Sequence, residues 1–77
     1  MATPKNHTID VRPLIANGEE PLALIRSKVD ALAPDDTLTV IAPFLPAPLI
    51  ELLRSEGFHA TPEHRSDGAW SVHFRKS

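Results

Sequence analysis

Four histidines are the residues of this 77-residue chain with the most versatile chemistry, since imidazole binds metals and exchanges protons near neutral pH. Their spacing argues against a shared metal. His59 and His64 are five residues apart on one expected strand, so their side chains should lie on opposite faces. His59 and His73 would share a face only as diagonal neighbours, and zinc takes three or four converging ligands. We predict no metal and no cofactor, and interpret these histidines as solvated strand residues, with His64 packed against Trp70.

Catalytic groups do not form a recognisable arrangement either. The chain has no cysteine, which excludes disulfides, thiolate nucleophiles and iron–sulfur clusters. Its serines lie on expected helix, turn, strand or tail positions, away from any His–Asp pair. Glu63 and Asp67 form a carboxylate pair beside an expected hairpin, but acidic loops commonly serve solubility. The sequence predicts a protein that is not an enzyme.

Charge and hydropathy exclude further classes of function. The formal net charge of −2 lacks the strongly basic face of a nucleic-acid-binding protein. No apolar stretch approaches the roughly 18 residues of a membrane span. The opening residues, MATPKNHT, lack the apolar core of a signal peptide, so residues 1–7 are interpreted as a polar tail. We predict a cytoplasmic protein, a monomer or weak dimer, that binds neither nucleic acid nor membrane.

Two short strands are expected to position the groups in the first half of the chain. In HTIDVRPL, Ile9 and Val11 alternate with polar residues, which predicts a half-buried strand that Pro13 ends. In TLTVIAP, Leu38 and Val40 should share the buried face of a second strand.

A helix is predicted between these strands. Its apolar residues recur at helical spacing, and they are Leu22, Leu24, Ile25, Val29 and Leu32. Gly18 belongs to the turn before it, Glu19 and Glu20 suit its positive end, and Pro21 is tolerated in its first turn. The helix should stop near Ala33, because Pro34 restricts the residue before it.

A second helix is predicted in PLIELLRSEG, after a proline-rich loop. Pro48 suits its first position, and Gly57 suits the left-handed conformation that commonly follows a helix. Its buried stripe is expected to consist of Leu49, Leu52 and Leu53.

The last two strands, FHATPEHR and AWSVHFRK, are expected to form a hairpin around Ser66-Asp67-Gly68. A three-residue loop pairs residues whose numbers sum to 134, so Trp70 should lie opposite His64. Gly68 takes the position that needs a positive φ. Pro62 predicts that its strand is an edge of the sheet.

The resulting order, β-α-β-α-β-β, predicts a single α/β domain over residues 8–76, a two-layer sandwich with a mixed four-stranded sheet. Right-handed crossovers place both helices on one face. Both helix N-termini then lie at the edge where open α/β sheets bind ligands. Candidate binding residues on this rim are Arg12, Gly18, Glu19, Pro21, Phe44, Pro46, Pro48, His64 and Trp70.

Two of these candidates carry alternatives. Arg12 beside the helix N-termini favours a small anion, but Glu19, Glu20 and Asp10 already supply negative charge there. Phe44 either packs under the second helix as a hydrophobic staple or stands exposed as an apolar contact.

The strings IDVRPL, GEEPLALI, VDALAP, IAPFLPAPL and DGAWSVHFRK resemble a cysteine-less branch of the TusA/SirA-like sulfur-carrier superfamily, domain-of-unknown-function family 2249. The resemblance covers residues 8 to 76. It implies the sandwich fold. It also implies a bacterial family whose members occur beside or fused to haemerythrin-like and nitrogen-oxide respiration proteins.

Sulfur carriers of this superfamily hold a persulfide on the cysteine of a Cys-Pro-x-Pro motif. The matching window here is Gly18-Glu19-Glu20-Pro21, so only the second proline is kept and the cysteine position is Gly18. Without a thiol there is no persulfide to carry.

We therefore expect a small non-enzymatic domain that binds a protein partner through this rim. The alternative is a carrier of a small ligand, an anion or a metal that uses the rim or the strand histidines.

Overall fold

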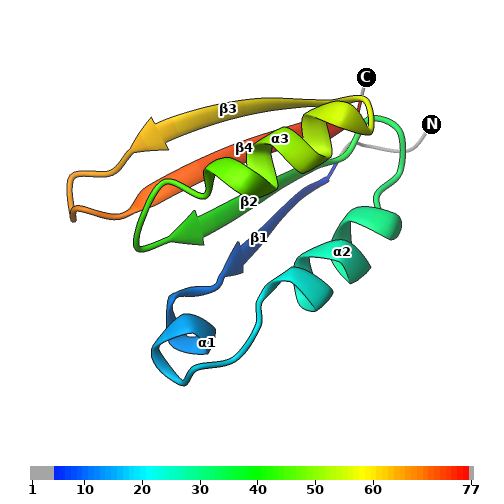
Figure 1. Ribbon diagram of the computed structural model, residues 1–77. Coiled ribbons are helices and arrows are strands. Elements are labelled where there is room, and N and C mark those ends of the chain that lie inside the picture. The colour runs from blue at the N-terminus through cyan, green and yellow to red at the C-terminus, as the bar shows by residue number, and fades with distance from the viewer. Residues whose placement is uncertain (1–4, 77) are drawn as a thin grey trace.

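The computed structural model describes residues 5–76 as a four-stranded sheet with helices packed against it (Figure 1). The elements are β1 (Asn6–Asp10), α1 (Arg12–Ala16), α2 (Leu22–Asp30), β2 (Thr37–Ala42), α3 (Ala47–Ser55), β3 (Phe58–His64) and β4 (Trp70–Lys76). The strand order is β1-β2-β4-β3, with β1 parallel to β2 and the other neighbours antiparallel. The predicted mixed four-stranded α/β sandwich is confirmed.

The start of β1 falls inside the segment that the sequence suggests as a tail. Asn6 and His7 already belong to this strand, and Asn6 lies beside Thr37 of β2. Residues 1–4 of the expected tail lie outside the described residues.

The core lies between one face of the sheet and helices α2 and α3, which Figure 1 shows on the same side of it. The sheet residues with no exposed surface are Leu38, Val40, Val72 and Phe74. They form one apolar cluster with Ile25 and Val29 of α2 and with Leu49, Ile50 and Leu53 of α3. The other face of the sheet carries mainly polar side chains, such as Thr39 and His73, together with the apolar Ile41.

The chain after β1 differs from the prediction. The apolar–polar alternation predicts a strand that runs to Arg12, whereas β1 ends at Asp10 and α1 follows. Pro13 lies in the first turn of α1, where a proline leaves no N–H unpaired. Val11 keeps one ladder bond, from its N–H to the carbonyl oxygen of Ile41 at 2.9 Å, and its side chain is buried.

The buried stripes of the two long helices also differ from the prediction. In α2, Leu22 and Leu24 are exposed, and the helix ends at Asp30 rather than near Ala33. In α3, Ile50 is buried and Leu52 is exposed, the reverse of the prediction. Periodicity alone cannot tell the centre of an apolar stripe from its flanks.

The hairpin follows the predicted register. Trp70 pairs with His64, Val72 with Pro62, and the other pairs keep the sum of 134. The N–H of Arg65 donates to the carbonyl oxygen of Ala69 at 2.8 Å, which closes the three-residue loop. Gly68 has a φ of +87°, and β3 is an edge strand, both as predicted.

Candidate functional site: an apolar pocket beside an ionic cluster

A pocket of about 260 Å³ opens between the first turns of α2 and α3, beyond the carboxyl end of β2. This is the edge where open α/β sheets commonly bind ligands. We call it the apolar pocket. It is lined by Val11, Ile15, Glu20, Pro21, Leu22, Ile25, Val40, Ala42, Phe44, Pro46, Pro48, Leu49 and Leu52. Glu20 is the one charged residue in this lining, so the pocket suits an apolar group.

Prolines shape the loop that forms one wall of the apolar pocket. Pro46 caps α3 with a φ of −83°, and Pro48 lies in the first turn of this helix, close to its predicted place. The Ala47 N–H donates to the carbonyl oxygen of Leu45 at 2.9 Å, which tightens the approach to the helix. Phe44 sits on this stiffened loop with 53% of its surface exposed, so it stands at the mouth of the pocket rather than under α3.

The structure divides the nine predicted rim residues into two groups. Those that line the apolar pocket are Pro21, Phe44, Pro46 and Pro48. Those outside its lining are Arg12, Gly18, Glu19, His64 and Trp70. Gly18 serves the turn after α1, where its φ of +74° favours glycine. The ring centroids of His64 and Trp70 are 4.8 Å apart, as the predicted packing of the two residues requires.

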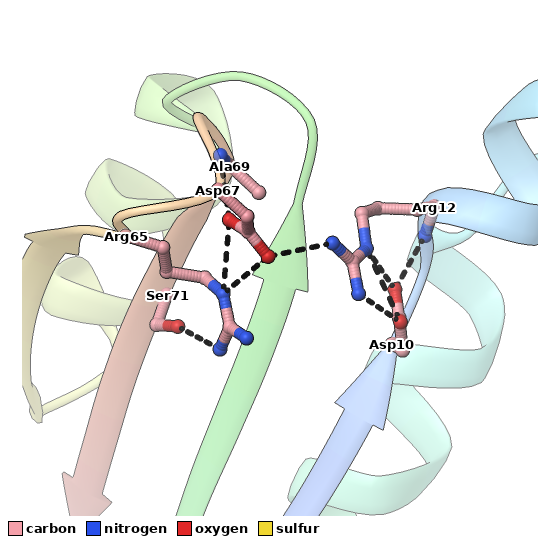
Figure 2. A network of polar contacts seen from close by, with 6 residues as sticks. All are labelled: Asp10, Arg12, Arg65, Asp67, Ala69 and Ser71. Atoms are coloured by element: carbon pink, nitrogen blue, oxygen red, sulfur yellow. Dashed lines mark hydrogen bonds and ion pairs between the residues drawn. The ribbon is translucent and has the colours of Figure 1, made fainter.

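Beside the apolar pocket lies a set of charged residues that we call the ionic cluster, formed by Asp10, Arg12, Arg65 and Asp67 (Figure 2). Arg12 Nη2 lies 2.7 Å from Asp10 Oδ2, and Arg12 Nη1 lies 3.3 Å from Asp67 Oδ2. Arg65 Nε also lies 3.3 Å from Asp67. The tip of the β3–β4 hairpin therefore meets the end of β1, which places Arg12 and the hairpin on one edge of the sheet.

The ionic cluster keeps its carboxylates charged. The hydrogen bond from the Arg12 side chain is the main cause that lowers the pKa of Asp10 below its ordinary value. The pKa of Asp67 is lowered mainly by the backbone N–H of Ala69, and then by Arg65 and Arg12. Opposite charges within hydrogen-bonding distance compensate one another, so this cluster has little residual charge to attract a free ion.

The donors that an anion would need are also engaged. Arg12 is shared between Asp10 and Asp67. At the start of α2, Glu20 Oε1 accepts the Leu22 N–H at 3.2 Å. Two of the negative groups weighed against an anion in the sequence, Asp10 and Glu20, thus occupy donors that an anion would need.

On the uncovered face of the sheet, His59 and His73 line one shallow pocket. His73 Nδ1 lies 2.9 Å from Thr39 Oγ1, and His73 Nε2 lies 3.5 Å from Glu63 Oε2. Within residues 5–76, no group of three or more metal-ligating side chains converges. In the same part of the chain, no helix is long and apolar enough to cross a membrane.

Several pocket residues escaped the sequence analysis. Ile15 lies on α1, which no apolar period foretold, because five residues are too few to show one. Leu22 and Leu52 did carry a signal in the sequence, because each is an apolar residue beyond those needed to cover the sheet. In the structure both are partly exposed and line the pocket between α2 and α3. Leucines at the flanks of two neighbouring helices can thus form opposite walls of an apolar pocket.

The comparisons with known proteins place the chain in a family. Residues 8–76 match the family described as "Uncharacterized conserved protein (DUF2249)", and the chain belongs to this family. No curated protein and no solved structure matches it.

Proposed function

We propose that this member of the DUF2249 family is a non-enzymatic partner-binding domain, and that its apolar pocket receives an apolar side chain of another protein. One observation carries the proposal: the half-exposed Phe44 stands at the mouth of a pocket whose lining is almost entirely apolar. Contiguous exposed apolar surface on a folded domain marks contact sites.

The size of the pocket favours a side chain over a cofactor. Pockets that bury drug-sized ligands measure about 300–1,000 Å³, whereas this one measures about 260 Å³. Its apolar rim also extends outward through exposed residues, which are Leu22, Phe44, Leu45 and Leu52. A pocket with an apolar rim fits an anchor side chain and the segment that carries it.

The prolines support binding at low entropic cost. Pro43, Pro46 and Pro48 restrict the loop that presents Phe44, so less chain freedom is lost when a partner docks. The alternative function is a small-ligand carrier. With Glu20 as the one charged residue in the lining, such a ligand would be apolar rather than a metal or an oxyanion.

The resemblance to sulfur carriers supplies the remaining elements of the proposal. The chain would use the carrier fold without the carrier chemistry, because it has no cysteine. The partner we propose is a haemerythrin-like protein or another protein of bacterial nitrogen-oxide respiration, met in the cytoplasm. This link rests on the resemblance alone.

Calorimetric titration with such partner proteins tests the proposal. A Phe44→Ala variant should weaken binding about 30-fold or more, since truncating an anchor residue costs about 2 kcal/mol or more. Leu24→Ala is the matched control, because Leu24 is a comparably exposed apolar residue outside the pocket lining. Equal loss in both variants, or binding that ignores both, would place the contact elsewhere.

A second arm separates the alternative. Haem, as the most apolar candidate, is titrated into labelled protein beside divalent metals, nitrite and phosphate, which the apolar lining should not hold, and amide shifts are recorded. Stoichiometric binding of any of them would favour a carrier over a partner-binding domain.

A further inference from the structure

The two edges of the sheet differ in how much backbone hydrogen bonding they leave open. In β1, the ladder to β2 uses every second residue, because Thr37 donates to the carbonyl oxygen of Lys5 and Val11 donates to Ile41. The N–H and C=O groups of Asn6, Thr8 and Asp10 therefore point away from β2. No other strand neighbours β1, and no hydrogen bond within residues 5–76 reaches these six groups. We call this row the free edge.

The opposite edge, on β3, is blocked at its centre. The Arg65–Ala69 bond sets the alternation, so the outward-pointing backbone groups of β3 belong to Phe58, Ala60, Pro62 and His64. Arg54 Nη2 occupies the carbonyl oxygen of Ala60 at 3.0 Å, and Pro62 has no N–H to offer. Proline and covering side chains are the devices by which natural sheets prevent strand addition. The free edge of β1 carries neither.

An exposed leucine lies on the same side as the free edge. Leu22 faces the apolar pocket and α3, and Leu24 follows it by about 200° around the helix. Leu24 therefore lies on the side of α2 that faces away from α3, and Figure 1 shows that α2 is the helix beside β1, the edge strand of the sheet. Its surface is 38% exposed, although it contributes nothing to the pocket.

We infer that the free edge pairs with the free edge of a second copy of this chain, to form a continuous eight-stranded sheet. An antiparallel pairing about Thr8 places Asn6 opposite Asp10 of the second copy and brings the two Thr8 residues together. All the outward N–H and C=O groups then face each other, as a two-fold interface requires.

The side chains in this register are complementary. Asn6 Oδ1 already accepts the Thr37 hydroxyl at 2.8 Å, which leaves the Asn6 amide N–H groups as donors. Asp10 is an acceptor whose low pKa keeps it charged. Each Asn6 therefore meets an acceptor, and no like charges lie opposite each other. This complementarity selects a second copy over an unrelated strand.

The interface is small, so the dimer is weak. Five-residue strands and one leucine per copy cover less area than the roughly 1,200–2,000 Å² of stable complexes. The inference uses a different surface from the apolar pocket and does not depend on the proposed function.

Sedimentation equilibrium over a wide concentration range tests the inference. We expect a monomer–dimer equilibrium for the natural sequence, with concentration-dependent shifts of the Asn6, Thr8 and Asp10 amides in NMR spectra. Thr8→Pro transfers the device of Pro62 to β1, because it removes an outward N–H and leaves the β1–β2 ladder intact. The loss of two hydrogen bonds per dimer should raise the dissociation constant about tenfold or more.

Thr8→Lys gives a second variant that keeps every backbone group and sets two like charges across the two-fold axis. Its matched control is Thr61→Lys, which adds the same charge to the exposed face of β3 away from the free edge. Loss of dimer in Thr8→Lys but not in Thr61→Lys supports the inference. A monomer at all concentrations, a dimer indifferent to both Thr8 variants, or shifts centred on Phe44 would overturn it.

Discussion

The ionic cluster and the apolar pocket lie at the same end of the sheet, where β1 and β2 finish, yet they differ in how many of their groups already have a partner within the chain. In the ionic cluster, each charged side chain has an opposite charge within 3.3 Å. In the apolar pocket, Phe44, Leu22 and Leu52 keep large exposed surfaces. The cluster is complete within the chain, whereas the pocket gains from contact with another molecule.

This difference shows why charge is a poor guide to the site here. In the sequence, Arg12 is the clearest candidate for an anion-binding residue near the helix N-termini. In the structure its guanidinium group donates to Asp10 and Asp67 instead. Exposed ion pairs contribute little to stability and are weakened by salt. The groups at this end of the sheet that would gain most from a further contact are apolar, and the most exposed of them, Phe44, lies in the loop between β2 and α3.

The strongest test of the comparison is Ile25→Ala. Ile25 lines the apolar pocket and is only 3% exposed, so its truncation should lower the free energy of unfolding by about 2–4 kcal/mol. Urea unfolding measures the change. Leu24→Ala, one residue away and 38% exposed, should lower it by about 1 kcal/mol, because this side chain buries less apolar surface than Ile25 does. Equal effects would mean that the pocket floor is not packed as described.

A smaller effect is expected for Phe44→Ala. About half of the Phe44 side chain is buried, so its loss should lower the free energy of unfolding by about 1 kcal/mol. Thermal and urea unfolding at fixed protein concentration measure this value. A loss as large as that of Ile25→Ala would mean that Phe44 acts as a staple of α3 and not as a contact residue.

Acid pH probes the ionic cluster. Asp10 and Asp67 have lower pKa values in the folded chain than the roughly 3.9 of an unfolded aspartate. Their contribution to stability is therefore complete above about pH 5 and is lost as the pH falls below about 4. An Asp10→Asn, Asp67→Asn double variant should show a shallower loss of stability in acid, measured by urea unfolding.

The double variant should keep some acid sensitivity. Asp36, at the other end of the sheet, also has a lowered pKa, mainly because its carboxylate accepts the Lys5 N–H. Asp35→Asn is the control, because it removes the same charge at a residue outside the ionic cluster. If the free energy of unfolding of the double variant fell with acid as steeply as that of the natural sequence, protonation of these two carboxylates would not contribute to acid unfolding.

The smallest effect is expected for Arg12→Gln. Its ion pairs are exposed and solvated, so the thermal midpoint should move by little more than the error of the measurement. Added salt screens exposed charges, so the difference between the variant and the natural sequence should become smaller still. A large drop would mean that Arg12 holds β1 to the hairpin tip and that the two halves of the edge depend on each other.

The sequence predicts the sheet well because strand pairing leaves several independent marks. Pro62, Gly68 and the alternation through Trp70 and Phe74 all fix the same hairpin register. Each helix leaves only one signal in the sequence, an apolar period, and this period does not separate the buried stripe from flanking residues such as Leu22 and Leu52. The apolar pocket depends on those flanks, so only its proline wall and Phe44 could be predicted.

The parallel pairing of β1 with β2 has a consequence for how the domain can be attached to other molecules. Thr37, at the start of β2, lies beside both Asn6 and Arg75, so the two described ends of the chain emerge together. The apolar pocket lies beyond Ala42, at the far end of the same strand. A linker, tag or solid support joined at either terminus would therefore lie at the opposite end of the domain from the pocket and would leave the pocket accessible.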